Sequence, residues 1–182
     1  MGTRSDSRTS ASPLGTEVFL ALGSNKGDPE AFFQLAVKGL TDGGFQVRKL
    51  SPLYKTAPVD CEEGVPPFLN AVLCGSWPDS PESLLKLCQQ LERRAGRPEK
   101  HSSRQARELD LDIILFGKEI LRTAELTVPH PRAFQRAFVL VPLHDVAPDA
   151  VFPDSGKTVA QLLSELPCPD NIDHHIQPYK EP

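Results

Sequence analysis

The sequence lacks the features that mark exported, membrane-spanning or nucleic-acid-binding proteins. None of its apolar runs approaches the ~20 residues of a membrane-spanning helix, and its first residues lack the apolar stretch of a secretory signal. The 182 residues carry a net charge of −4, so no overall positive field attracts nucleic acid or an anionic membrane. We therefore expect a cytoplasmic protein without nucleic-acid or membrane partners, in which any recognition of phosphate comes from a local cluster of charges.

The sequence also has no Cys-x-x-Cys pair, which excludes the common zinc knuckles and dithiol redox sites. We expect the four cysteines, Cys61, Cys74, Cys88 and Cys168, to be reduced and mostly packed thiols. The length favours a single domain, which we assign to residues 17–166. A disordered N-terminal tail (1–16) should precede it, and an irregular, polar C-terminal tail (167–182) should follow it.

Hydrophobic patterns predict four strands and two helices in this domain. The strands are expected at residues 18–22, 45–54, 68–77 and 109–116. One helix should begin after the N-cap Asp28 and end at Gly43, and the other should begin after Asp79 or Ser80 and end near Gly96. The order strand, helix, strand, strand, helix, strand is that of a ferredoxin-like βαββαβ sandwich. This is an α+β fold with one antiparallel sheet and its helices on one face.

Two aspartates in the fourth predicted strand are the sharpest local feature. Asp110 and Asp112 are two residues apart, so their carboxylates should lie about 7 Å apart on one face of the strand, with Leu111 on the other face. The apolar run 113–115 follows without a polar break, which predicts a central strand. Such a pair can hold one or two hard divalent cations, and a solvated polar face is the alternative.

A cluster of basic residues lies just before these aspartates. The segment 96–108 has no hydrophobic periodicity and is predicted to be a long loop. Cations beside paired carboxylates are typical of phosphoryl transfer, in which positioning and charge neutralisation do most of the catalysis. A solvated basic face is again the alternative. The basic residues are Arg93, Arg94, Arg97, Lys100, His101, Arg104 and Arg107.

Four further features are weaker on their own. Phe68 and Asn70 share a face of the third predicted strand and suit a flat, hydrogen-bonding heterocycle, although a phenylalanine is more often a core residue. His130 lies between two prolines and could contact a phosphate or cap a turn. The apolar stretch 137–143 predicts a helix or strand that extends the core toward the C-terminus. The turn at residues 23–25 matches neither the Walker loop nor the dinucleotide fingerprint.

Seven segments taken together resemble 6-hydroxymethyl-7,8-dihydropterin pyrophosphokinase, an enzyme family of folate biosynthesis. They run in the order and spacing of the family over about residues 18–165. The segments are LALGSN (20–25), YKTAPV (54–59), FLN (68–70), LERRAGR (91–97), RELDLDIILF (107–116), VPHPR (128–132) and RAFVLVPL (136–143).

The resemblance implies an ATP-dependent transferase that moves pyrophosphate from ATP to the hydroxymethyl group of the pterin and releases AMP. It implies two Mg²⁺ ions held by Asp110 and Asp112, and it makes Arg97 and Arg107 the catalytic cations beside them. The matching pterin-binding positions are Thr56, Ala57, Val59, Phe68, Asn70 and Phe138, with the two phenylalanines stacking on the ring. The matching ATP-binding positions are Gln89, Glu92, Arg97, Arg107, Ile113, Thr127, His130 and Arg136. The partners are then these small-molecule substrates, and a monomer is expected.

Two positions depart from the pattern of some family members. Arg104 stands where a tryptophan occurs, and Glu99 replaces a second loop arginine. Two other classes of protein stay open from the residues alone. A palm-like metal-dependent nucleotidyltransferase also presents paired aspartates, but the net charge argues against its basic template groove. A non-catalytic nucleotide- or RNA-binding module would need stacking aromatics where this chain has carboxylates.

Overall fold

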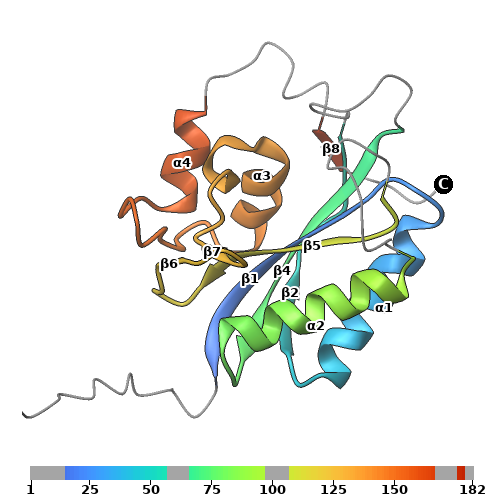
Figure 1. Cartoon of the computed structure of the whole chain (residues 1–182). Helices are drawn as coiled ribbons and strands as arrows, with labels where there is room; N and C mark the ends of the chain where they lie inside the picture. The colour runs from blue at the N-terminus through green and yellow to red at the C-terminus, as the bar shows by residue number, and fades with distance from the viewer. Residues whose placement is uncertain (1–14, 57–65, 97–106, 167–175, 179–182) are drawn as a thin grey trace, which may run out of the picture.

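An antiparallel sheet forms the centre of the computed structural model, which describes residues 15–56, 66–96, 107–166 and 176–178 (Figure 1). In this described part the sheet has six strands: β1 (Thr16–Ser24), β2 (Gln46–Leu50), β3 (Tyr54–Thr56), β4 (Phe68–Trp77), β5 (Asp110–Phe116) and β8 (Ile176–Pro178). The strands follow the order β5–β1–β4–β3–β8, and β2 pairs with β4 as well. This order and the βαββαβ succession confirm the ferredoxin-like α+β fold predicted from the sequence.

The two predicted helices begin at side-chain caps. Helix α1 (Pro29–Asp42) begins after Asp28, whose Oδ1 accepts a hydrogen bond from the backbone N of Ala31 at 3.1 Å. Helix α2 (Pro81–Arg94) begins after Ser80, whose Oγ accepts from the backbone N of Ser83 at 3.2 Å, so Ser80 rather than Asp79 is the cap. Each cap satisfies one of the N–H groups that the first turn leaves unpaired.

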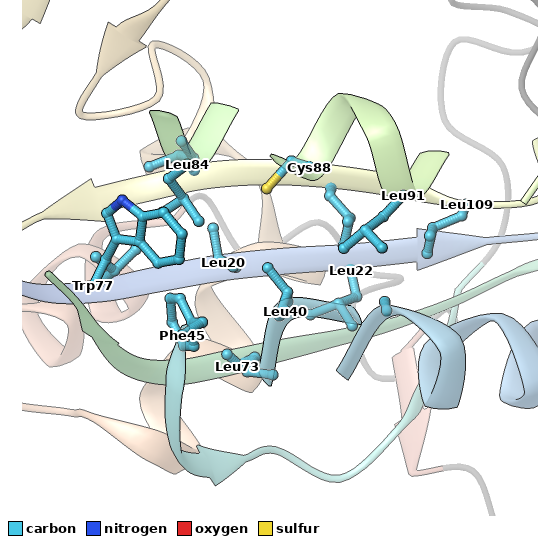
Figure 2. Close-up of a cluster of buried hydrophobic side chains, with 14 of the residues drawn as sticks. Leu20, Leu22, Leu40, Phe45, Leu73, Trp77, Leu84, Cys88, Leu91 and Leu109 are labelled. Carbon is cyan, nitrogen blue, oxygen red and sulfur yellow. The ribbon is translucent and has the colours of Figure 1, made fainter. Parts of the chain in front are cut away.

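Helices cover both faces of the sheet (Figure 1). The two predicted helices lie on one face, as expected for the βαββαβ core, and the helices of the C-terminal extension lie on the other. Helices α1 and α2 pack on one face over a core that includes Leu20, Leu22 and Leu91 (Figure 2). On the other face, α3 (Ala137–Val146) and α4 (Val159–Glu165) pack over a second core that includes Phe19 and Val72. The C-terminal extension can cover this second face because β1 and β4 carry apolar side chains at both odd and even positions.

The single strand predicted at residues 45–54 is two strands, β2 and β3. Ser51 lies between them, and its Oγ accepts from the backbone N of Val72 at 2.9 Å and donates to the carbonyl of Pro52 at 2.8 Å. Pro52 has no N–H to donate to a ladder, so the strand ends and resumes with Tyr54.

Strand β5 is an edge strand of this sheet, so the predicted central position is wrong. Its apolar run is buried for another reason, because residues after the strand fold back over its outer side. The hairpin of β6 (Leu121–Arg122) and β7 (Thr127–Val128) lies there, and the backbone N of His130 donates to the carbonyl of Ile114 at 3.0 Å. An edge strand that is covered in this way therefore has the same apolar sequence pattern as a central strand.

The C-terminal residues predicted to be irregular include β8, which pairs antiparallel with β3. The free edge of β3 offers the backbone groups that β8 bonds. Cys74 and Cys88 are buried free thiols, as expected, and Cys61 and Cys168 lie outside the described residues. None of the described helices is long and apolar enough to cross a membrane.

Candidate active site

Strands β5, β1 and β4 bring three residues into one row at the end of β1. Gly23 of β1 pairs with Asp110 of β5 on one side and with Asn70 of β4 on the other. Paired residues of antiparallel strands direct their side chains to the same face, so Asp110 and Asn70 lie on the same side of the sheet. Gly23 places no side chain between them, and a Cβ there would be in van der Waals contact with both, at 3.4 Å from Asn70 Oδ1 and 3.9 Å from Asp110 Cβ. We refer to Asp110, Gly23 and Asn70 as the polar row.

The two aspartates share a face, as the alternation predicts. Asp110 and Asp112 are half-buried, whereas Leu111 is buried in the core under α1 and α2. The guanidinium of Arg107 pairs with Asp110 at 2.5 Å between Nη1 and Oδ2, so this carboxylate already attracts a cation. The described residues contain no cluster of three or more His, Cys, Asp or Glu side chains that could hold a metal. Two carboxylates fit Mg²⁺, which is commonly held by one or two carboxylates together with substrate phosphates and water.

A buried amide lies at the β4 end of the polar row. The Nδ2 of Asn70 donates to Thr56 Oγ1 at 2.8 Å, and both side chains are buried. Phe68 lies two residues from Asn70 and pairs with Thr56, so all three side chains project from the same face. The structure therefore brings together three of the predicted pterin positions, while Ala57 and Val59 lie outside the described residues.

The predicted second aromatic residue, Phe138, lies in the first turn of α3. The guanidinium carbon of Arg136 lies 5.3 Å from the centre of its ring, within the range of a cation–π contact. Helix α3 is joined to β3 at its other end, where the hydroxyl of Tyr54 donates to Asp145 Oδ2 at 2.5 Å. Burial and this carboxylate raise the pKa of Tyr54 to about 12, so the hydroxyl stays protonated.

His130 is a neutral hydrogen-bond donor at ordinary pH. Burial lowers its pKa to about 4, and the charges of Arg136 and Arg132 act in the same direction, whereas Asp110 acts against them. Its Nδ1 accepts from the backbone N of Arg132 at 3.2 Å, so the proton of the neutral ring lies on Nε2. The structure thus places a neutral imidazole N–H within electrostatic reach of Asp110 and of two arginines.

Several predicted ATP positions lie apart from the polar row. Gln89 and Glu92 belong to α2, which packs on the opposite face of the sheet, and Glu92 is buried with its Oε1 accepting from Leu111 N at 2.8 Å. The side chain of Ile113 is buried in the core on that side, so a contact with nucleotide has to use its backbone. Thr127 is half-buried on β7. A nucleotide that contacted both α2 and the aspartates would have to pass the edge of β5.

Two residues of the site escaped the sequence reasoning. Gly23 opens the polar row, and Asn25 makes hydrogen bonds to Pro66 and Arg107. The local signal for them is the Gly-Ser-Asn turn after a buried strand, and this turn is also typical of an ordinary connection between a strand and a helix. Beside this turn Lys26 pairs with Glu108 at 2.6 Å. Burial acts to raise the pKa of Glu108, but the hydrogen bond and the charge of Lys26 act against it, and the net effect is a lowered pKa. Arg97, Glu99 and Arg104, with most of the predicted loop, lie outside the described residues.

Comparison with solved structures gives the same fold. The crystal structure of Plasmodium falciparum HPPK-DHPS with pteroate superposes with a TM-score of 0.65 at 13% sequence identity, over 82% of this chain and 44% of that chain. At this identity the likeness supports the fold alone.

Comparison of sequences identifies the family. The chain is 40% identical over 129 residues to the 2-amino-4-hydroxy-6-hydroxymethyldihydropteridine pyrophosphokinase of Bacillus subtilis, covering 70% of this chain and 76% of that protein. It is 35% identical over 161 residues to the folic acid synthesis protein fol1 of Pneumocystis carinii, covering 88% of this chain and 21% of that protein. It is 41% identical over 140 residues to the mitochondrial folate synthesis bifunctional protein of Arabidopsis thaliana, covering 76% of this chain and 25% of that protein.

The chain thus spans about a fifth to a quarter of the length of these fungal and plant relatives. A family model described as 7,8-dihydro-6-hydroxymethylpterin-pyrophosphokinase (HPPK) matches residues 19–148, which include the whole polar row and both aspartates. The chain therefore belongs to the 7,8-dihydro-6-hydroxymethylpterin-pyrophosphokinase family.

Proposed function

We propose that this chain transfers pyrophosphate from ATP to the hydroxymethyl group of 6-hydroxymethyl-7,8-dihydropterin and releases AMP, as a step of folate biosynthesis. The observation that carries the proposal is the polar row, in which a carboxylate for a metal-bound phosphate and an amide for a heterocycle flank one glycine. Membership of the family supports it. In the reaction the hydroxymethyl group gives its hydroxyl proton to solvent, and its oxygen bonds to the β-phosphorus of ATP. The bond from that phosphorus to the α–β bridging oxygen breaks, and AMP leaves with that oxygen.

The β4 end of the row binds the pterin in this proposal. Because Nδ2 of Asn70 donates to Thr56, Oδ1 is left to accept from an N–H of the ring. Phe68, two residues along the same face, and Phe138 supply apolar surface for the flat ring. These contacts hold the hydroxymethyl group toward Gly23, where no side chain blocks its approach to the phosphates.

The β5 end of the row binds the triphosphate. Asp110 and Asp112 would hold two Mg²⁺ ions, and when bound these ions supply neutralisation of phosphate charge. Arg107 lies against Asp110 and can move its guanidinium to a phosphate oxygen, where its charge-assisted bonds strengthen as negative charge shifts toward AMP. His130 donates through Nε2 to a phosphate and, being neutral, adds no charge of its own.

The test is to incubate the chain with ATP, Mg²⁺ and 6-hydroxymethyl-7,8-dihydropterin and to measure AMP and the diphosphorylated pterin. AMP should form only when the pterin is present, in a one-to-one ratio with the pterin product. A nucleotidyltransferase would instead release pyrophosphate and retain the AMP group on its acceptor, so the products separate the two reactions. The cytoplasmic location and the monomeric state are further parts of the proposal, to be checked by cell fractionation and light scattering.

A further inference from the structure

Asn25 follows the last residue of β1 and is only 5% exposed. Its side chain and backbone make three hydrogen bonds to distant parts of the chain. The Oδ1 accepts from the backbone N of Arg107 at 2.7 Å, and the backbone N of Asn25 donates to the carbonyl of Arg107 at 3.0 Å. The Nδ2 donates to the carbonyl of Pro66 at 3.0 Å. One residue therefore bonds both backbone polar groups of Arg107 and, through the other end of its amide, the segment that enters β4.

These two segments belong to different halves of the site. Pro66 lies two residues before Phe68 on the pterin side, and Arg107 lies three residues before its partner Asp110 on the phosphate side. The strands that follow, β4 and β5, do not touch each other in the sheet, because β1 lies between them. Among the described residues beyond the end of β1, Asn25 bonds both of these segments and so links them directly.

We propose that Asn25 is a positioning residue, whose amide fixes the backbone of Arg107 relative to the pterin-binding end of β4. The proposal rests on the function proposed above. The guanidinium of Arg107 is carried by a long side chain, so its reach to a phosphate depends on where its backbone is held. A displacement of about 1 Å in such a group can lower a rate by about 10²-fold, even when the group remains in the site.

A double-mutant cycle tests whether Asn25 acts through Arg107. Single-turnover rates are measured for the parent chain, Asn25→Ala, Arg107→Ala and the double variant, with ATP, Mg²⁺ and the pterin saturating. We expect Asn25→Ala to lower the rate about 10- to 100-fold in the parent, and less than about 3-fold when Arg107 is already absent. An equal loss in both backgrounds would mean a general effect on the fold and would overturn the proposal.

Ser51→Ala is the matched control. Ser51 is also 5% exposed and, like Asn25, both accepts from a backbone N–H and donates to a backbone carbonyl. Loss of the Ser51 hydroxyl should lower the unfolding free energy but leave the single-turnover rate within about 3-fold of that of the parent. A loss of rate in Ser51→Ala as large as that in Asn25→Ala would show that any buried polar deletion has this effect, against the proposal.

A readout without substrates separates this inference from the proposed function. The amide N–H of Arg107 should exchange at least 10-fold faster with solvent in Asn25→Ala than in the parent, and no faster in Ser51→Ala, as measured by NMR. Should Asn25→Ala fail to fold, Asn25→Asp keeps the acceptor for Arg107 but loses the donor to Pro66. That variant should keep the Arg107 amide protected but lower the single-turnover rate by about 3-fold or more, because Arg107 is then no longer tied to the pterin-binding end of β4. An unchanged rate would overturn the proposal. If the parent chain releases no AMP, the proposed reaction is refuted. If the exchange rate of the Arg107 amide is the same in Asn25→Ala as in the parent, the positioning role is refuted.

Discussion

Filling the space above Gly23 is the most direct perturbation of the proposed site. A Cβ at this position lies 3.4 Å from Asn70 Oδ1 and 3.9 Å from Asp110 Cβ, so Gly23→Ala makes ordinary contacts. The added methyl groups of Gly23→Val extend about 1.5 Å further, and one aimed at either neighbour would come within about 2–2.5 Å of it. Gly23→Val must therefore push Asn70 and Asp110 apart or occupy the space through which the hydroxymethyl group approaches the phosphates.

The two variants should separate stability from activity. Gly23→Ala should keep the unfolding free energy or raise it by about 0.4–1 kcal/mol, because alanine restricts the unfolded chain. Gly23→Val should cost about 1–3 kcal/mol through overpacking and lower kcat/KM for the pterin at least about 100-fold. Urea unfolding and steady-state release of AMP measure both quantities. A folded Gly23→Val protein with the kinetic constants of Gly23→Ala would refute the idea that the reacting groups meet above this glycine.

Three further predictions concern the remaining groups of the site. Asp110→Ala and Asp112→Ala should each lower the rate by about 10³-fold or more with the fold intact by circular dichroism, and near-normal turnover at saturating Mg²⁺ would contradict their role as ligands. Phe68→Ala and Phe138→Ala should weaken pterin binding by roughly 1–3 kcal/mol in calorimetry, and an equal loss for ATP would identify them as core residues instead. The pKa of His130 is about 4 when folded and 6.5 in its ordinary state, so the unfolded chain takes up the proton first as the pH falls. The unfolding free energy of the metal-free protein should therefore fall between pH 6.5 and pH 4, by up to about 3 kcal/mol more than in His130→Gln, and parallel curves for the two proteins would contradict the burial of this ring.

The sequence predicts best the features whose cause is local. Asp28 and Ser80 begin helices because a cap needs only the next three residues, and the alternation of β5 suffices to direct Asp110 and Asp112 to one face. The features that were wrong or missed depend on contacts between distant residues. The burial of β5 at the edge of the sheet, for example, depends on residues that follow the strand, such as His130, whose backbone N donates to the carbonyl of Ile114.

The polar row shows the same limit at the site. Asn70 and Asp110 could each be chosen as a binding residue, but nothing in the local pattern says that both pair with Gly23. Register across three strands is set by the whole sheet and cannot be read from one strand. Asn25 was missed for the same reason, because its partners lie 41 and 82 residues away.

The hydrogen bond between Tyr54 and Asp145 lowers the conformational entropy that the protein itself has to lose when a ligand binds. It ties β3, which carries Thr56, to α3, which carries Phe138, before any substrate arrives. Since the pKa of Tyr54 is about 12, the hydroxyl keeps its proton near neutral pH and stays the donor to Asp145. If the pterin binds as proposed, it need not immobilise the strand and the helix against each other, so more of the contact energy remains as affinity.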